Sequence, residues 1–131
     1  MNSKSLPNIK IKWMTLNLLI KGLLLVEVNV KELDGACVKQ PNNKLLPFHA
    51  YSNKTHNTPT MCIQECHDKA FNLAGVKWSK ECWCGNEDPP RSKYTAMTLC
   101  NMPCTGDKTI MCGGGDVLNM YKTSKLMVLK T

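Results

Sequence analysis

The chain contains eight cysteines, and all of them lie between Cys37 and Cys112. An even number at this density is typical of a disulfide framework, which forms and persists in oxidising compartments. We therefore expect a small module that is secreted or lies on the extracellular face of a membrane. A module held by four cross-links more often presents a binding surface than encloses a catalytic pocket. The cysteines are Cys37, Cys62, Cys66, Cys82, Cys84, Cys100, Cys104 and Cys112.

The length of 131 residues leaves room for one domain. We expect a leader over residues 1–32, the cysteine-bearing domain over 33–123 and a tail over 124–131. A core this small supplies only about 3–5 kcal/mol by itself, whereas each disulfide adds about 2–4 kcal/mol. The cross-links are therefore expected to be essential for stability.

The leader has early lysines followed by an apolar run from Trp13 to Val26. This order is typical of a secretory signal, but Lys21 interrupts the run and no small-x-small cleavage site stands out. The alternative is a poorly ordered leader that does not belong to the domain. The run is too short and too charged for a membrane span. Any membrane tether is therefore expected to lie outside this sequence.

Three classes of function find little support in the sequence. The net charge of +7 comes from scattered lysines with no run of four or more, which argues against a nucleic-acid partner. Cys62-x3-Cys66 and Cys100-x3-Cys104 loosely fit the spacing of zinc ligands, but Cys82-x-Cys84 and the three histidines do not, so we expect no metal and no cofactor. We also expect no enzyme, because bridged cysteines are not nucleophiles. The carboxylates Glu81, Glu87 and Asp88 are interpreted as solvated loop groups rather than a glycosidase pair.

Thr58-Pro59 predicts the start of a helix, with threonine as the cap and proline at the first helical position. The helix is expected to run over Thr60–Phe71. Cys62 and Cys66 are four residues apart, so their side chains should leave one face of this helix.

The next segments predict strands. A short apolar run over 73–78 is expected to pair, through a turn at Ser79-Lys80, with a second strand over 81–84. Trp78 is expected to pack in the core. Residues 86–92 predict a loop, because Pro-Pro does not continue a central strand. A last strand is expected over 117–121.

The cysteine positions predict a double cross-link between helix and strand. Period two places Cys82 and Cys84 on one face of their strand, opposite the two helix cysteines. The pairing is either Cys62–Cys82 with Cys66–Cys84 or the crossed alternative. Cys104–Cys112 and Cys37–Cys100 are the preferred remaining pairs. The expected fold class is therefore α+β, with a helix packed on an antiparallel sheet and four disulfides.

Two stretches resemble the WSC domain: residues 74–86 (AGVKWSKECWCGN) and residues 100–107 (CNMPCTGD) followed by MCGG at 111–114. The resemblance covers about 35–121 and reproduces the eight-cysteine spacing of the family. It implies an extracellular α+β module with a carbohydrate-binding function. It also implies four disulfides: Cys62–Cys82, Cys66–Cys84, Cys104–Cys112 and Cys37–Cys100. Ser79 stands where the family commonly has glycine in the hairpin turn.

The resemblance implies a glycan or cell-surface polysaccharide as the partner. Family members occur in cell-wall sensors, Kremen-type receptors and invertebrate peptide O-xylosyltransferases. The alternative is therefore a protein–protein interaction module, or a non-catalytic appendage of a larger receptor or glycosyltransferase.

Sugar binding typically uses exposed aromatic faces together with amides and carboxylates. Trp83 alternates with Cys82 and Cys84 and should point away from the bridged interior, where it either meets a ligand or covers the other face of the sheet. We expect the ligand-contact set to be Trp83, Asn86, Tyr51 and Tyr94.

The Asn53-Lys54-Thr55 sequence is a sequon for N-glycosylation. It lies in a polar loop just before the expected helix. The sequence therefore predicts a glycan on Asn53.

Overall fold

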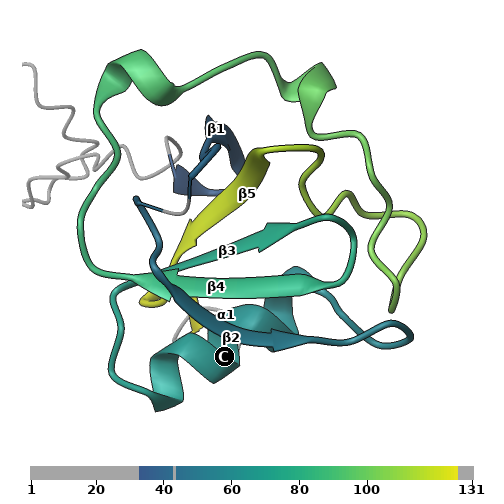
Figure 1. The fold of residues 1–131 in the computed structure, drawn as a ribbon. Coiled ribbons are helices and arrows are strands. Elements are labelled where there is room, and N and C mark those ends of the chain that lie inside the picture. The colour runs from purple at the N-terminus through teal and green to yellow at the C-terminus, as the bar shows by residue number, and fades with distance from the viewer. Residues whose placement is uncertain (1–32, 43, 127–131) are drawn as a thin grey trace, which may run out of the picture. The chain divides into compact units, whose positions relative to one another are not determined.

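The computed structural model describes residues 33–42 and 44–126, so the expected leader and its apolar run lie outside the described residues. In the described part of the chain, five strands form an antiparallel sheet and one α-helix packs against it (Figure 1). The strands are β1 (Ala36–Lys39), β2 (Phe48–Ser52), β3 (Leu73–Lys77), β4 (Glu81–Gly85) and β5 (Val117–Lys122). The helix is α1 (Pro59–Asp68), and two short 3₁₀ turns are η2 (Arg91–Lys93) and η3 (Met97–Leu99). The expected α+β class is confirmed.

The sheet has the strand order β1-β5-β3-β4-β2, with every neighbouring pair antiparallel. The β3–β4 hairpin occupies the centre, and all five residues of β3 are buried. The beginning of β3 and the ends of β4 and β5 therefore meet at one end of the sheet, at the left of Figure 1.

Helix α1 begins as the sequence predicts but ends earlier. The Thr58 hydroxyl accepts a hydrogen bond from Met61 N at 3.1 Å, and Pro59 occupies the first turn. The expected end at Phe71 is wrong, because Ala70 takes a left-handed conformation with φ 68°. Phe71 N then donates to Cys66 O and Ala70 N to His67 O, which is the Schellman pattern of helix termination.

All eight cysteines are paired, and no free cysteine remains. The helix–strand cross-links are Cys62–Cys82 and Cys66–Cys84, so the crossed alternative is excluded. The other two disulfides are Cys37–Cys100 and Cys104–Cys112. These are the four pairs that the resemblance implies.

The sheet separates two hydrophobic clusters. On the helix side, the disulfides of α1 and β4 pack with Ile63, Ala74 and Val76. On the opposite side lies a cluster of aliphatic side chains from β1, β3, β5 and the segment before β2. Its buried members are Leu33, Val38, Leu46, Leu73, Leu118 and Met120.

The turn between β3 and β4 differs from the prediction. Lys77 pairs with Glu81, so three residues, Trp78 to Lys80, make the connection. Both Trp78 and Ser79 have positive φ, 56° and 67°. The expectation that Trp78 packs in the core is wrong, since this residue is 40% exposed. Because Trp78 lies in the turn, its side chain does not follow the alternation of side chains between the two faces of the sheet that holds along β3.

Candidate functional site

The four expected ligand-contact residues do not form one surface. Trp83 and Tyr94 pack against the aliphatic cluster on the sheet side away from α1, whereas Tyr51 packs against the disulfide cluster. Asn86 lies just beyond the end of β4 and is exposed. A single binding site therefore includes only some of these four residues.

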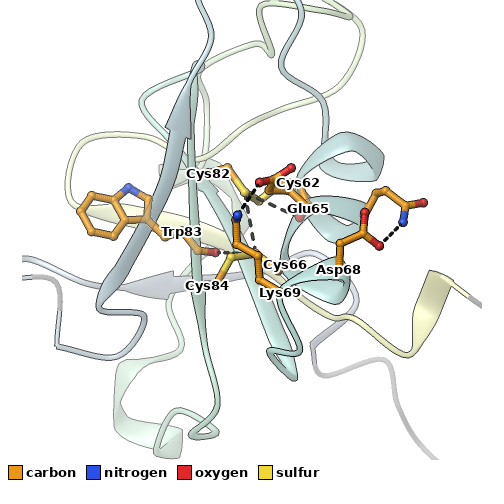
Figure 2. Close-up of polar contacts among 9 residues, drawn as sticks. Cys62, Glu65, Cys66, Asp68, Lys69, Cys82, Trp83 and Cys84 are labelled. Carbon is orange, nitrogen blue, oxygen red and sulfur yellow. Dashed lines mark hydrogen bonds and ion pairs between the residues drawn. A yellow bond between two sulfur atoms is a disulfide. The ribbon is translucent and has the colours of Figure 1, made fainter.

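Trp83 lies on the opposite side of β4 from the four helix and strand cysteines, as Figure 2 shows. Its ring is half-buried, with the His49 ring 4.8 Å away and Lys77 Nζ 5.8 Å from its centroid. Its indole Nε1 donates to Glu81 Oε1 at 2.9 Å. Much of this ring is thus occupied by neighbours within the sheet.

Tyr94 adds a second half-buried ring on the same side of the sheet as Trp83. It forms an isolated antiparallel bridge with Val38, and the Arg91 guanidinium lies 5.7 Å from its ring centroid. Leu45, before β2, packs on the same cluster. Trp83, Tyr94 and Leu45 therefore pack against the same buried cluster.

Tyr51 is bound into the fold. Its hydroxyl donates to Asn57 Oδ1 at 2.6 Å, and Asn57 is fully buried. Burial, with a smaller contribution from the Glu65 carboxylate, raises the pKa of the Tyr51 hydroxyl far above its usual range. Tyr51 remains a neutral hydrogen-bond donor at physiological pH.

Asn86 borders a hollow of about 310 Å³ at the end of the sheet where β3 begins and β5 ends. Its lining side chains carry amides, hydroxyls, a carboxylate and an ammonium group. We call it the polar hollow; it is lined by Asn72, Asn86, Asp88, Lys122, Thr123 and Ser124. The Lys122 ammonium and the Asp88 carboxylate lie 3.5 Å apart.

A second hollow of about 280 Å³ also borders Asn86. Its lining includes an aromatic ring and two aliphatic side chains, with one lysine and one glutamate. We call it the Phe71 hollow; it is lined by Lys44, Leu45, Pro47, Phe71, Gly85, Asn86 and Glu87. The two hollows thus meet at a residue that the sequence singled out.

Three hydrogen bonds, each with at least one backbone partner, hold the polar hollow in place. Asn72 N donates to Asn86 Oδ1 at 2.9 Å, which ties the start of β3 to the end of β4. Thr123 N donates to Asn72 O at 2.9 Å, and its hydroxyl donates to Phe71 O at 2.7 Å. The residues after β5 therefore fix the position of the segment that joins α1 to β3.

One wall of the Phe71 hollow forms where Leu45 and Leu46 approach Gly85 closely. A Cβ atom on Gly85 would lie 2.9 Å from Leu45 O and 2.8 Å from Leu46 Cδ2, so only glycine fits. Gln40, which is 1% exposed, secures the same segment. Its Oε1 accepts from Leu46 N at 2.6 Å and its Nε2 donates to Leu46 O at 3.3 Å.

Phe71 is a site residue that the sequence reasoning missed. Its ring stacks on Phe48 of β2, with centroids 5.2 Å apart. The sequence placed Phe71 at the end of the helix and did not predict β2, because this half-exposed edge strand lacks a clear hydrophobic alternation. Asn86 belongs to the motif over 74–86 that carries the family resemblance, whereas no local sequence feature predicted a binding role for Phe71.

Trp78 is a second residue that the reasoning missed. Leu99 and Met111 are exposed as well, at 48% and 37%. Ser79 N donates to Cys112 O at 3.0 Å, and a Cβ atom on Gly115 would lie 3.3 Å from the Trp78 ring. No local signal marked Trp78 as a turn residue, because its position follows from the Lys77–Glu81 pairing, which leaves three residues between β3 and β4.

The Asn53 sequon lies in the turn after β2. Asn53 Oδ1 accepts hydrogen bonds from Thr55 N at 3.0 Å and from His56 N at 2.9 Å. This geometry is an Asx-type turn, with Thr55 exposed. The glycan on Asn53 stays a prediction.

Two structural findings bear on other functions. Among the described residues, the sulfur atoms of Cys62, Cys66 and Cys82 come close enough to hold a metal ion, but all three are engaged in disulfides. A bridged sulfur is not a thiolate ligand. In the same part of the chain, no helix has the length and apolar character needed to cross a membrane.

The structure so far defines a small α+β module, held by four disulfides, with a hollowed surface at one end of its sheet. The family model of the WSC domain matches residues 35–114. The chain therefore belongs to the WSC domain family.

Relatives of the chain are found in animals and fungi. It is 34% identical to Xylosyltransferase oxt of Drosophila melanogaster over 89 residues, which cover 68% of this chain and 10% of the relative. It is 38% identical to Kremen protein 1 of Homo sapiens over 91 residues, covering 66% of this chain and 19% of that protein. A WSC domain-containing protein of Arthroderma benhamiae is 34% identical over 73 residues, which cover 53% of this chain and 8% of that protein. The chain thus matches only a small part of each relative.

Proposed function

We propose that this chain is an extracellular WSC module that binds a glycan and catalyses no reaction of its own. The binding site is the end of the sheet around Asn86. The observation that carries the proposal is the meeting of two hollows at Asn86, one lined by polar groups and one by Phe71 with aliphatic side chains. A sugar needs both kinds of surface, because its hydroxyls form directed hydrogen bonds and its apolar face packs on an aromatic ring.

In this proposal the expected contact residues have different roles. Asn86 contacts the ligand directly. Trp83 and Tyr94 flank the site, because Leu45 packs against the same buried cluster as they do and also lines the Phe71 hollow. Tyr51 supports the fold through its hydrogen bond to Asn57.

The extracellular assignment is supported by the chemistry of the cysteines. Every cysteine is bridged, and disulfides of this density persist in oxidising compartments. A glycan on Asn53 fits the same location. We propose a secreted protein or one held on the extracellular face of a membrane.

A glycan array tests the proposal with the oxidised full chain, and a reduced sample serves as the control for folding. We expect binding to a defined class of glycans that disappears on reduction, because the hollows depend on the cross-linked fold. A blank array from a sample whose folding is shown by its NMR spectrum would contradict glycan binding.

The exposed apolar residues around Trp78 favour a second candidate, a protein–protein interaction module within a larger protein. Tryptophan is enriched among the residues that dominate binding energy at protein interfaces. Leu99 and Met111 are also exposed, and the segment 112–115, which follows Met111, approaches both the Trp78 turn and Leu99 O. The match covers only 10% of the xylosyltransferase relative and 19% of Kremen protein 1, and these small shares support a role as an appendage of a larger protein. Binding to a purified protein that Trp78→Ala abolishes, with no binding to glycans, would favour this candidate.

A further inference from the structure

The two hollows at Asn86 are neighbours along the chain as well as in space. Phe71 and Glu87 line the Phe71 hollow, and the residues that follow them in the sequence, Asn72 and Asp88, line the polar hollow. We propose that the hollows are two adjacent subsites for consecutive residues of an uncharged glycan. This inference rests on the proposed glycan-binding function, and it adds the number, order and charge of the sugars.

The volumes set the number of sugars. At about 310 and 280 Å³, the hollows lie just above and just below the lower limit of the range for ligand pockets, about 300–1,000 Å³. Each hollow therefore accepts one sugar ring. Two hollows that share Asn86 accept two linked rings.

The linings set the order of the sugars. In the Phe71 hollow, the aromatic ring with Leu45 and Pro47 offers an apolar surface for the face of one sugar. In the polar hollow, side chains such as Asn72 and Ser124 offer partners for the hydroxyls of the next sugar. The two subsites are thus chemically different, so the glycan binds in one direction.

Asn86 is the residue that contacts both sugars. Its Oδ1 is engaged by Asn72 N at 2.9 Å, which fixes the side chain. Within the described part of the chain, its Nδ2 has no protein partner. This amide group therefore keeps two N–H donors for hydroxyl or ring oxygens at the junction of the two subsites.

The charges set the type of sugar. The polar hollow contains one acidic and one basic side chain, Asp88 and Lys122, already 3.5 Å apart. The Phe71 hollow likewise contains one of each, Glu87 and Lys44. A carboxylated or sulfated sugar would meet a carboxylate in either subsite and compete with it for the lysine, and like charges in contact oppose binding. The site therefore selects neutral sugars although the whole chain carries a net charge of +7.

Isothermal titration of the oxidised full chain with neutral gluco- and xylo-oligosaccharides tests this inference. We expect affinity for the better series to rise at least about tenfold from one sugar unit to two and then to level off up to four units. We also expect it to change little between about 50 and about 500 mM NaCl, because no net charge is neutralised. Heparin and chondroitin sulfate tetrasaccharides serve as the anionic probes.

Two variants separate the subsites. Phe71→Leu keeps apolar volume but removes the aromatic ring. This variant should lose the rise in affinity from one sugar unit to two, while monosaccharide binding in the polar hollow remains. Ser124→Ala should weaken monosaccharide binding and leave the Phe71 contact. The inference is overturned by a gain that continues beyond two units, or by tighter, salt-sensitive binding of the sulfated probes. Those results leave glycan binding intact, whereas a folded chain that binds none of the probes or array glycans overturns the proposed function as well.

Discussion

The side-chain oxygen of Asn86 accepts a hydrogen bond from the backbone N–H of Asn72 at 2.9 Å. Because β3 begins just after Asn72 and β4 ends just before Asn86, this bond closes the open end of the central hairpin. It uses one polar atom of Asn86 for the structure, whereas the proposed contact with the ligand uses the amide nitrogen. The structural role and the proposed binding role of Asn86 therefore belong to different atoms.

Replacing Asn86 by aspartate separates these two roles. Asn86→Asp keeps an oxygen for Asn72 N, so the free energy of unfolding should change by less than about 0.5 kcal/mol. It loses both N–H donors, so glycan affinity should fall at least about tenfold. Asn86→Ala should lose the affinity and also about 1 kcal/mol of stability. Urea unfolding and calorimetry measure the two quantities, and normal binding by Asn86→Asp would show that the amide does not contact the ligand.

Ser79 is expected to yield a more stable protein when replaced by glycine. Its φ of 67° lies in the left-handed region, where a side chain costs about 1–2 kcal/mol. Glycine removes this cost but makes the unfolded chain more flexible, so we expect a net gain of about 0.5–1 kcal/mol. Ser79→Ala, which keeps a Cβ atom, is the control and should give no gain. Equal unfolding midpoints in urea for the glycine and alanine variants would argue against strain at this position.

The disulfides should differ in their contribution to stability. Cys37–Cys100 joins residues 63 positions apart, whereas Cys104–Cys112 joins residues 8 apart. The loop-closure relation gives about 4 kcal/mol for the first and about 2.5 kcal/mol for the second. Paired cysteine-to-alanine variants, unfolded in urea without reductant, measure the two losses. The reverse order would show that native packing, rather than loop length, decides.

Alkaline pH should destabilise the fold through two tyrosines. Burial, and then the Asp34 carboxylate, raises the pKa of Tyr121 from 10.0 to about 12, and the pKa of Tyr51 is raised further. The folded state thus favours the protonated hydroxyls. The stabilisation from Tyr121 is complete below about pH 10 and is lost as the pH rises through about 12, by up to about 1.4 kcal/mol per pH unit. Tyr51 contributes a loss in the same direction.

Urea unfolding between about pH 8 and about pH 11 checks this dependence. Tyr121→Phe is the matched control, because it removes one titrating group and should flatten the decline. A wild-type stability that stays constant up to pH 11 would contradict the assigned pKa directions.

The sequence predicted the parts of the fold that depend on local spacing. Cys62 and Cys66 shared a helix face, and Cys82 and Cys84 shared a strand face, so the double cross-link followed from two periodicities. The same alternation placed Trp83 on the opposite side of β4. Strand β2 was not predicted, because its stability comes from pairing with β4 rather than from its own residues.

The candidate site was predicted only in part, for a physical reason. Asn86 stood next to a distinctive motif, but the hollows require segments distant in sequence to converge, such as residues 71–72 and 122–124. Trp78 was misplaced because the apolar run was extended by one residue into the turn. Register between strands, which the sequence does not contain locally, decides such positions.

NMR tests the proposed position of the sugar at Asn86 most directly. ¹⁵N-labelled oxidised full chain is titrated with a neutral disaccharide that binds in calorimetry. We predict that the amide shifts change around residues 44–47, 71–72, 85–88 and 122–124, including the side-chain amide of Asn86, while the Trp78 indole stays unmoved. Shifts confined to the Trp78 turn, or to Trp83 and Tyr94, would contradict a binding site at Asn86.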